Sequence, residues 1–163
     1  MNIGVVLFLW LLPLHSEAMP AVSTAVIGRV ADTTTAVLLQ DLTDDLRGRL
    51  EIAERVHVTV VDHNPLVMSV ETLGGRTGPF VISVDREFIR ELSPEELEAA
   101  IAHELGHVWI YTHHPFLQTE RLANDIAMRV VNRSAFEPVY EKVWSRTGIR
   151  GNLIEFLGPP AQQ

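Results

Sequence analysis

Three side chains close together in the sequence could hold and use a metal ion. His103 and His107 are four residues apart, and Glu104 directly follows the first of them. On an α-helix, a four-residue step leaves two side chains about 40° apart around the axis and about 6 Å apart along it, so both imidazoles project from one face. Zinc accepts imidazole nitrogens at about 2.0–2.1 Å, and two such rings can share one ion. We therefore predict that His103 and His107 bind Zn²⁺, one ion per chain.

Glu104 is expected to act on the reaction and not to ligate the ion. On the predicted helix its carboxylate lies beside the metal, where it can take a proton from a water molecule that the zinc activates. Together with His103 and His107 it forms the H-E-x-x-H pattern of zinc-dependent peptidases. Gly106, inside the pattern, costs about 1 kcal/mol relative to alanine in a helix interior. It therefore indicates the close approach of another backbone or of the metal site.

A third protein ligand is needed, because a catalytic zinc ion usually has three of them and one open position. Glu120 is the first candidate, at the start of a second predicted helix over 120–131, with Thr119 as its N-cap. Asn124 lies four residues after Glu120, on the same face of that helix. Its side chain could hydrogen-bond a ligand histidine and orient the ring.

Two other residues remain open as the third ligand. His113 follows His107 by six residues, which is the spacing of the longer H-E-x-x-H-x-x-G-x-x-H pattern. That pattern turns at a glycine where this chain has Ile110, and a β-branched residue disfavours such a turn. Asp125 is the remaining alternative. His113 and His114 are better explained as residues at the C-terminal end of the first helix, where a protonated ring is favourable.

The helix that carries the pattern has a strong start signal. Ser93 is a good N-cap, Pro94 suits the first helical position, and Glu96 completes a capping box. The helix should end near 111–112, before Pro115.

The segment before this helix predicts one helix and three strands. Apolar residues at three- and four-residue steps predict an amphipathic helix over 36–55, whereas 21–35 shows no clear period. Runs rich in β-branched residues predict strands over 57–62, 66–73 and 80–85. The short connections between these strands favour an antiparallel arrangement.

The segment that carries the two histidines and the segment that carries Glu120 resemble those of a known family. The run from Leu92 to Val108, with the strand at 80–84 before it, resembles the HtpX-like zinc metallopeptidases of the gluzincin group, which carry a similar L-S-x-x-E-L … A-H-E-x-G-H helix. Gluzincins use a glutamate of a following helix as third ligand, in an E-x-x-A-D setting. Glu120 to Ala123 match its first four positions, and Asn124 replaces the aspartate, as in the minimal ImmA/IrrE-type gluzincins.

The resemblance, over roughly residues 56–131, implies a fold and a mode of substrate binding. The fold is a zincin-like minimal domain of the α+β class. A small antiparallel sheet packs on helices, and the zinc site lies on the H-E-x-x-H helix and a following helix. The multiple membrane-spanning segments of the HtpX-like enzymes are lacking. The peptide or protein substrate is expected to add as an extended strand to the sheet's edge, at either 66–73 or 80–85.

The resemblance also implies hydrolysis of peptide bonds. Zinc held by His103, His107 and Glu120 activates a water molecule, and Glu104 accepts its proton and passes it to the leaving nitrogen. Spacing does not single out a further group that stabilises the developing oxyanion. The candidates are Tyr140, Arg133, His113 and His114. Tyr140 also fits an aromatic core on one face of a short C-terminal helix, together with Phe136, Val143 and Trp144.

Composition excludes several classes of protein. The chain has 163 residues, of which 47% are hydrophobic and 21% charged, and this indicates one globular domain. A formal net charge of −8 and a pI near 5.3 argue against binding nucleic acid, or a membrane surface, through a basic patch. The absence of cysteine excludes a disulfide framework, a thiol nucleophile and a thiolate metal site.

The N-terminal residues are typical of a secretory signal peptide. The apolar run 5–14 is shorter than the roughly 20 residues of a membrane span, and Ser16-Glu17-Ala18 places small residues where a signal peptidase would read them. We expect cleavage after Ala18, a single domain over 19–157 and a flexible tail over 158–163. The mature protein would be secreted or periplasmic and would keep no membrane span.

The competing hypothesis is a non-catalytic module that binds a peptide or protein partner on the same fold. Its zinc would be structural or its cleft blocked. A structural site has no need of Glu104, so the intact pattern favours an enzyme. A catalytic site would bind hydroxamate at its open position, whereas a closed four-ligand site would not.

Overall fold

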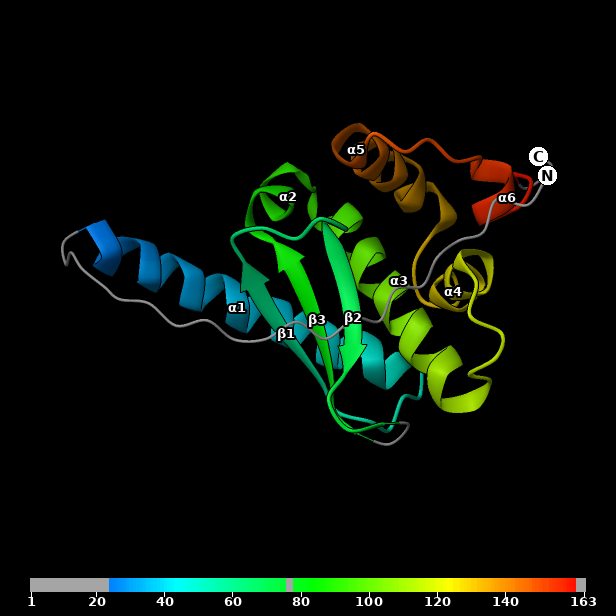
Figure 1. Cartoon of the computed structure of the whole chain (residues 1–163), viewed down its shortest axis with the longest axis horizontal. Helices are drawn as coiled ribbons and strands as arrows, with labels where there is room; N and C mark the ends of the chain where they lie inside the picture. The colour runs from blue at the N-terminus through cyan, green and yellow to red at the C-terminus, as the bar shows by residue number, and fades with distance from the viewer. Residues whose placement is uncertain (1–23, 76–77, 161–163) are drawn as a thin grey trace.

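The computed structural model describes residues 24–75 and 78–160 (Figure 1). Its elements in chain order are α1 (Thr24–Arg49), β1 (Val56–Val61), β2 (Met68–Thr72), β3 (Phe80–Asp85), α2 (Arg86–Glu91), α3 (Pro94–His113), α4 (Glu120–Ala127), the 3₁₀-helix η2 (Arg133–Ala135), α5 (Phe136–Thr147) and α6 (Leu153–Leu157). This is an α+β arrangement, with a small three-stranded sheet and helices packed on it. None of the helices in the described ranges is long and apolar enough to cross a membrane.

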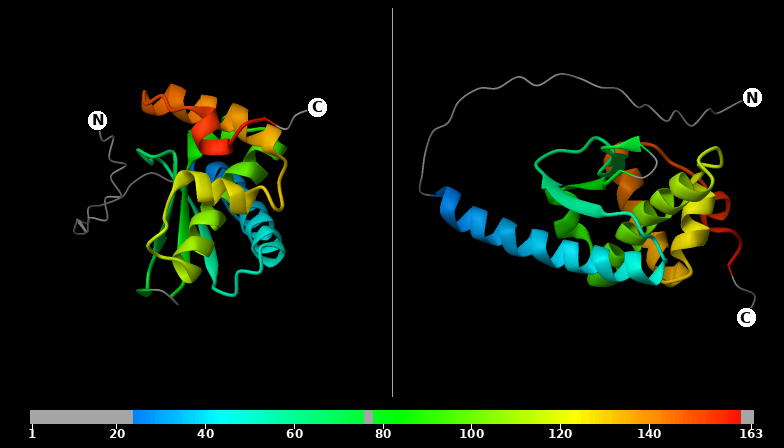
Figure 2. Two further views of the ribbon diagram at one scale, coloured as in Figure 1. Left: turned by 90° about the vertical axis from the view of Figure 1, so that its right-hand side faces the viewer. Right: turned by 90° about the horizontal axis from the view of Figure 1, so that it is seen from below.

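One face of the sheet carries the core. Along the central strand Phe80, Ile82 and Val84 are buried, while the residues between them are partly exposed. Helices α1 and α3 pack against each other, α1 on β1 and α3 on β2, so both cover this apolar face (Figure 2). The Phe80 ring meets Tyr111 of α3 edge-to-face, with centroids 5.7 Å apart. The alternation of buried and exposed residues thus positions α3 beneath the sheet.

The sheet is mixed, and the predicted antiparallel arrangement is wrong for one of its two strand pairs. The strand order is β1-β3-β2, with β1 parallel to β3 and β2 antiparallel to β3. The prediction treated strands joined by short connections as neighbours in the sheet. The segment 62–67 instead crosses the end of the sheet, a span of about 10 Å for two strand spacings, and leaves room for β3 between β1 and β2.

Asn64 holds this crossover in place. Its buried side chain donates to Ser69 Oγ (3.0 Å) and to the Ser83 carbonyl (2.9 Å), and so it contacts both β2 and β3. Its backbone N–H donates to Asp85 Oδ2 (3.1 Å). The contacts with Ser83 and Asp85 join residues about 20 apart in sequence, which local turn signals do not register.

Helix α1 begins and ends earlier than the sequence predicts. The helix expected over 36–55 spans Thr24–Arg49. Its first turns extend past the edge of the sheet (Figure 1), so a period that reports burial of one face gives no signal there. At its end the chain reverses at Glu51, whose φ of 57° is left-handed, and Arg47 Nη1 donates to the Ile52 carbonyl (2.9 Å).

The predicted start signals of α3 and α4 are confirmed. Ser93 Oγ accepts from the N–H of Glu96, and the Glu96 carboxylate accepts from the N–H of Ser93, which completes the capping box. Helix α3 runs to His113, one residue past the expected end. Thr119 caps α4 through Leu122 N–H (3.1 Å), but α4 ends at Ala127 and not at 131.

The C-terminal helices close the far side of α3 and α4. Helix α5 packs on α3, and α6 packs on α4. Gly158, where a flexible tail was expected to begin, is buried, and its carbonyl accepts from Arg133 Nη2 (3.0 Å). The predicted signal peptide over 1–18, like residues 161–163, lies outside the described residues.

Candidate metal centre

Helices α3 and α4 approach each other closely at Gly106. A methyl group on Gly106 would overlap the carbonyl of Ala123 and lie 3.0 Å from its Cα. This confirms the expectation that Gly106 marks the close approach of another backbone. The contact brings the first turn of α4, and with it Glu120, against the histidines of α3.

The three predicted ligands converge on one point. Glu120 Oε2 lies 3.1 Å from His103 Nε2, and Glu120 Oε1 lies 3.6 Å from His107 Nε2. The two Nε2 atoms are 3.2 Å apart. One ligand atom from each side chain lies within 4.8 Å of the others, a separation that one metal ion can bridge. The side chain of Glu120 is 36% exposed, so the group is open to solvent on one side.

The outer nitrogen of His103 is held by Asn124, as predicted. His103 Nδ1 lies 2.8 Å from Asn124 Oδ1. The Asn124 Nδ2 group faces the Phe156 carbonyl (3.0 Å), which can only accept a hydrogen bond, so the orientation of the amide is determined. The amide oxygen therefore faces His103, and Nδ1 must carry the hydrogen. In the neutral ring the lone pair is then on Nε2, the atom that faces the other ligands.

The outer nitrogen of His107 is held in the same way by Gln118, which the sequence did not predict. His107 Nδ1 lies 3.0 Å from Gln118 Oε1, and Gln118 Nε2 donates to the backbone carbonyl of His107 (3.1 Å). The amide is again oriented by a group that can only accept, so Nδ1 carries a hydrogen and, in the neutral ring, the lone pair is on Nε2. Gln118 lies in the loop before α4, where no periodicity marks a functional position.

The charges of the group favour a cation between the ligands. Although burial favours the neutral ring, the hydrogen bond that the protonated ring donates to Glu120 and the charges of Glu104 and Glu120 raise the pKa of His107 to about 9. Burial alone would raise the pKa of Glu120, but its hydrogen bonds to His103 and His107 hold that pKa well below its usual range. The centre therefore carries a proton when no metal is bound, because two lone pairs and a carboxylate otherwise face one another.

Glu104 lies beside the ligands without a partner of its own. Its side chain is only 8% exposed, and no residue of 24–75 or 78–160 donates a hydrogen bond to its carboxylate. Burial raises its pKa, against the attraction of His103 and His107. A buried carboxylate without donors destabilises the fold, which makes Glu104 a candidate functional residue.

The alternative ligands lie elsewhere. His113 is exposed and stacks on the indole of Trp109, with ring centroids 4.1 Å apart and planes at 6°. Asp125 is exposed and accepts two hydrogen bonds of 3.0 Å from Arg121 Nε. The group of three that could hold a metal in the described residues therefore contains neither His113 nor Asp125.

Among the four candidate electrophiles, Tyr140 is the one that contacts the centre. Its hydroxyl accepts from Asn124 Nδ2 (2.7 Å), and its ring meets that of His103 edge-to-face with centroids 6.2 Å apart. Tyr140 also stacks on Phe156, so the same side chain takes part in aromatic packing and contacts the candidate metal centre. Arg133 is engaged by Glu137 and Gly158, while His113 and His114 are exposed.

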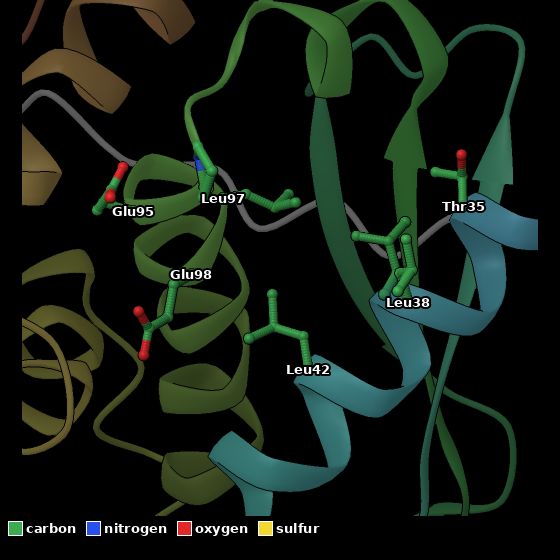
Figure 3. A pocket seen from close by; sticks show the side chains of 8 residues that line it. Thr35, Leu38, Leu42, Glu95, Leu97 and Glu98 are labelled. Atoms are coloured by element: carbon green, nitrogen blue, oxygen red, sulfur yellow. The ribbon is translucent and has the colours of Figure 1, made fainter.

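The donor set fits zinc. Two imidazole nitrogens and one carboxylate, with a position open to solvent, are the ligands of one class of catalytic zinc site. Calcium and magnesium prefer oxygen ligands, so two imidazoles disfavour them. A hollow of about 390 Å³ lies between α1 and the first turns of α3 (Figure 3), but four of its eight lining residues are leucines and none is His103, His107 or Glu120.

Comparisons with protein-family models, with curated proteins and with solved structures give no match for this chain. Its function is therefore inferred from the geometry of the site.

Proposed function

We propose that this protein is a zinc-dependent endopeptidase of the gluzincin type that acts outside the cytoplasm. One observation carries the proposal. The Nδ1 atom of each histidine is hydrogen-bonded to the amide oxygen of Asn124 or Gln118, so that the two Nε2 atoms and the Glu120 carboxylate face a common point. Polar side chains on an ordinary surface would not need to be oriented toward a common point in this way. The unpartnered carboxylate of Glu104 beside them favours catalysis over a structural ion.

In the proposed mechanism three residues hold the metal and Glu104 transfers the proton. His103, His107 and Glu120 would hold the zinc ion, which would supply Lewis-acid chemistry for the scissile carbonyl and for a water molecule. Glu104 accepts a proton from the attacking water at its carboxylate and passes it to the leaving nitrogen as the C–N bond breaks. Burial, which raises the pKa of Glu104, makes this carboxylate a better proton acceptor.

Tyr140 is the group that we assign to the developing oxyanion. Its hydroxyl oxygen accepts from Asn124, and no described residue accepts its own hydroxyl proton in turn. Burial raises the pKa of Tyr140, so the phenol keeps that proton at neutral pH. A donor of this kind contributes about 3–4 kcal/mol when it acts only on the transition state.

The outer edge of β2 is the proposed docking strand for the substrate. Strand β3 is central, so it has no free edge, and this excludes one of the two strands expected from the sequence. The outer edge of β1 is closed by Gln40 of α1, which donates to the Val56 carbonyl (2.9 Å) and accepts from Val58 N–H (3.0 Å). Strand β2 packs on α3, the helix of the two histidines. Its edge can take an extended peptide.

Cleavage profiling of a mixed peptide library by mass spectrometry tests the proposal. The zinc-loaded protein should cleave peptides, and Glu104→Gln, which leaves the three ligands intact, should cleave them about 10²–10⁴-fold more slowly. Cleavage by both proteins at similar rates would point to a contaminating peptidase. No cleavage by the wild type with stoichiometric zinc would overturn the proposal and favour the non-catalytic binding module.

A further inference from the structure

The loop between α3 and α4 is tied to the metal centre by a single side chain. Gln118 bridges two atoms of one residue: its Oε1 lies 3.0 Å from His107 Nδ1, and its Nε2 donates to the His107 carbonyl at 3.1 Å. The neighbouring side chains point away into solvent, Phe116 being 97% and Leu117 55% exposed. Gln118 is therefore the inward-facing anchor of an otherwise exposed apolar loop.

We propose that Gln118 is the positioning residue of His107, so that zinc binding and the conformation of the α3–α4 loop are coupled through it. The inference rests on the proposed metal site. A ring whose Nδ1–H is held by an acceptor keeps its tautomer and orientation and becomes a stronger ligand. Without Gln118, no other described side chain holds His107 Nδ1, and the ring could rotate away from Glu120.

The two ligand histidines differ in what holds them. His103 is oriented by Asn124, which is fully buried within α4 and is held in turn by Phe156. His107 is oriented by Gln118, which lies in a loop where Phe116 and Leu117 are exposed. A movement of this loop would therefore change the orientation of His107 and not that of His103. Zinc, in return, should protect the loop.

Zinc affinity, measured by chelator competition, tests the assignment. Gln118→Met keeps the length of the side chain but loses the acceptor, and we expect it to weaken zinc binding about 10–100-fold. Gln118→Glu restores an acceptor for Nδ1–H and should recover most of that loss. Phe116→Ala, in the same loop but without a contact to a ligand, should bind zinc like the wild type.

Amide hydrogen exchange gives a second measurement: the effect of zinc on the loop would not depend on Gln118 if this residue only stabilised the fold. Zinc should slow amide exchange over 114–119 in the wild type and in Phe116→Ala, but much less in Gln118→Met. Wild-type affinity and wild-type protection in Gln118→Met would overturn the inference and leave the metal site standing. A wild-type protein that binds no zinc at all would overturn the proposed function itself.

Discussion

The backbone carbonyl of Phe156 accepts a hydrogen bond of 3.0 Å from Asn124 Nδ2, and this contact determines which end of the amide faces His103. It ties a ligand of α3, through a side chain of α4, to the backbone of α6. The same contact gives a physical reason for an asparagine at this position, where an aspartate is the alternative. An aspartate could still accept from His103 Nδ1, but it could not donate to Phe156.

We expect Asn124→Asp to lose stability and keep zinc. The buried carbonyl of Phe156 would lose its donor and face a carboxylate oxygen, at a cost of about 1–3 kcal/mol in the free energy of unfolding. Urea unfolding of the metal-free protein measures this loss. Asn152→Asp is the matched control: Asn152 caps α6 by accepting from Ile154 N–H, which a carboxylate does equally well. Equal stability of Asn124→Asp and the wild type would contradict the assigned amide orientation.

The close contact of α3 and α4 makes a second prediction. Gly106→Ala should force the helices apart, because its methyl group would overlap the carbonyl of Ala123. We expect a loss of about 1–3 kcal/mol in the free energy of unfolding, as for overpacked cores, together with weaker zinc binding because Glu120 moves away from the histidines.

Gly48→Ala is the control for this substitution. Gly48 also lies within a helix, α1, but a methyl group there meets nothing within 4 Å. Because Gly48 lies in the last turn of α1, the variant should be as stable as the wild type or gain up to about 0.5 kcal/mol from the better helix propensity of alanine. A Gly106→Ala protein as stable as Gly48→Ala would show that the two helices can separate at little cost.

The parts of the structure that the sequence predicted are those with local signals. The capping box of Ser93 and Glu96 and the four-residue steps from His103 to His107 and from Glu120 to Asn124 depend on helix geometry alone. They located both helices and the three residues that could hold a metal ion.

The parts that it missed depend on non-local contacts. The parallel pairing of β1 with β3 follows from the crossover that Asn64 holds, and the role of Gln118 follows from the path of a loop. Neither leaves a period in the sequence. The start of α1 was also missed, since its first turns extend beyond the sheet, where packing on the sheet sets no period.

Glu104 should cost stability in the metal-free protein. Burial raises its pKa above the value in the unfolded chain, so its contribution to stability is favourable at low pH and is lost as the pH rises through the folded-state pKa. Glu104→Gln removes the charge at nearly constant size. We expect a higher unfolding temperature than the wild type at pH 7, a difference that shrinks towards pH 4, and turnover reduced about 10²–10⁴-fold.

Calorimetric scans at the two pH values measure the first effect, and peptide hydrolysis measures the second. Glu141→Gln, an exposed position on α5, should change neither. A Glu104→Gln protein that is less stable than the wild type at pH 7 would mean that the carboxylate has a stabilising partner.

Zinc and a proton should compete for His107. In the metal-free protein the carboxylates of Glu120 and Glu104 raise the pKa of His107 to about 9 against the effect of burial, so the ring is protonated at neutral pH. The ring must lose this proton to bind zinc, because metal ligands bind deprotonated. The dissociation constant should therefore fall about tenfold for each pH unit between about pH 6 and pH 8 and level off near pH 9. Calorimetry in two buffers of different ionisation enthalpy should count about one proton released per zinc bound. An affinity that is constant from pH 6 to pH 8 would show that His107 is already neutral, and that the carboxylates do not hold a proton in the centre.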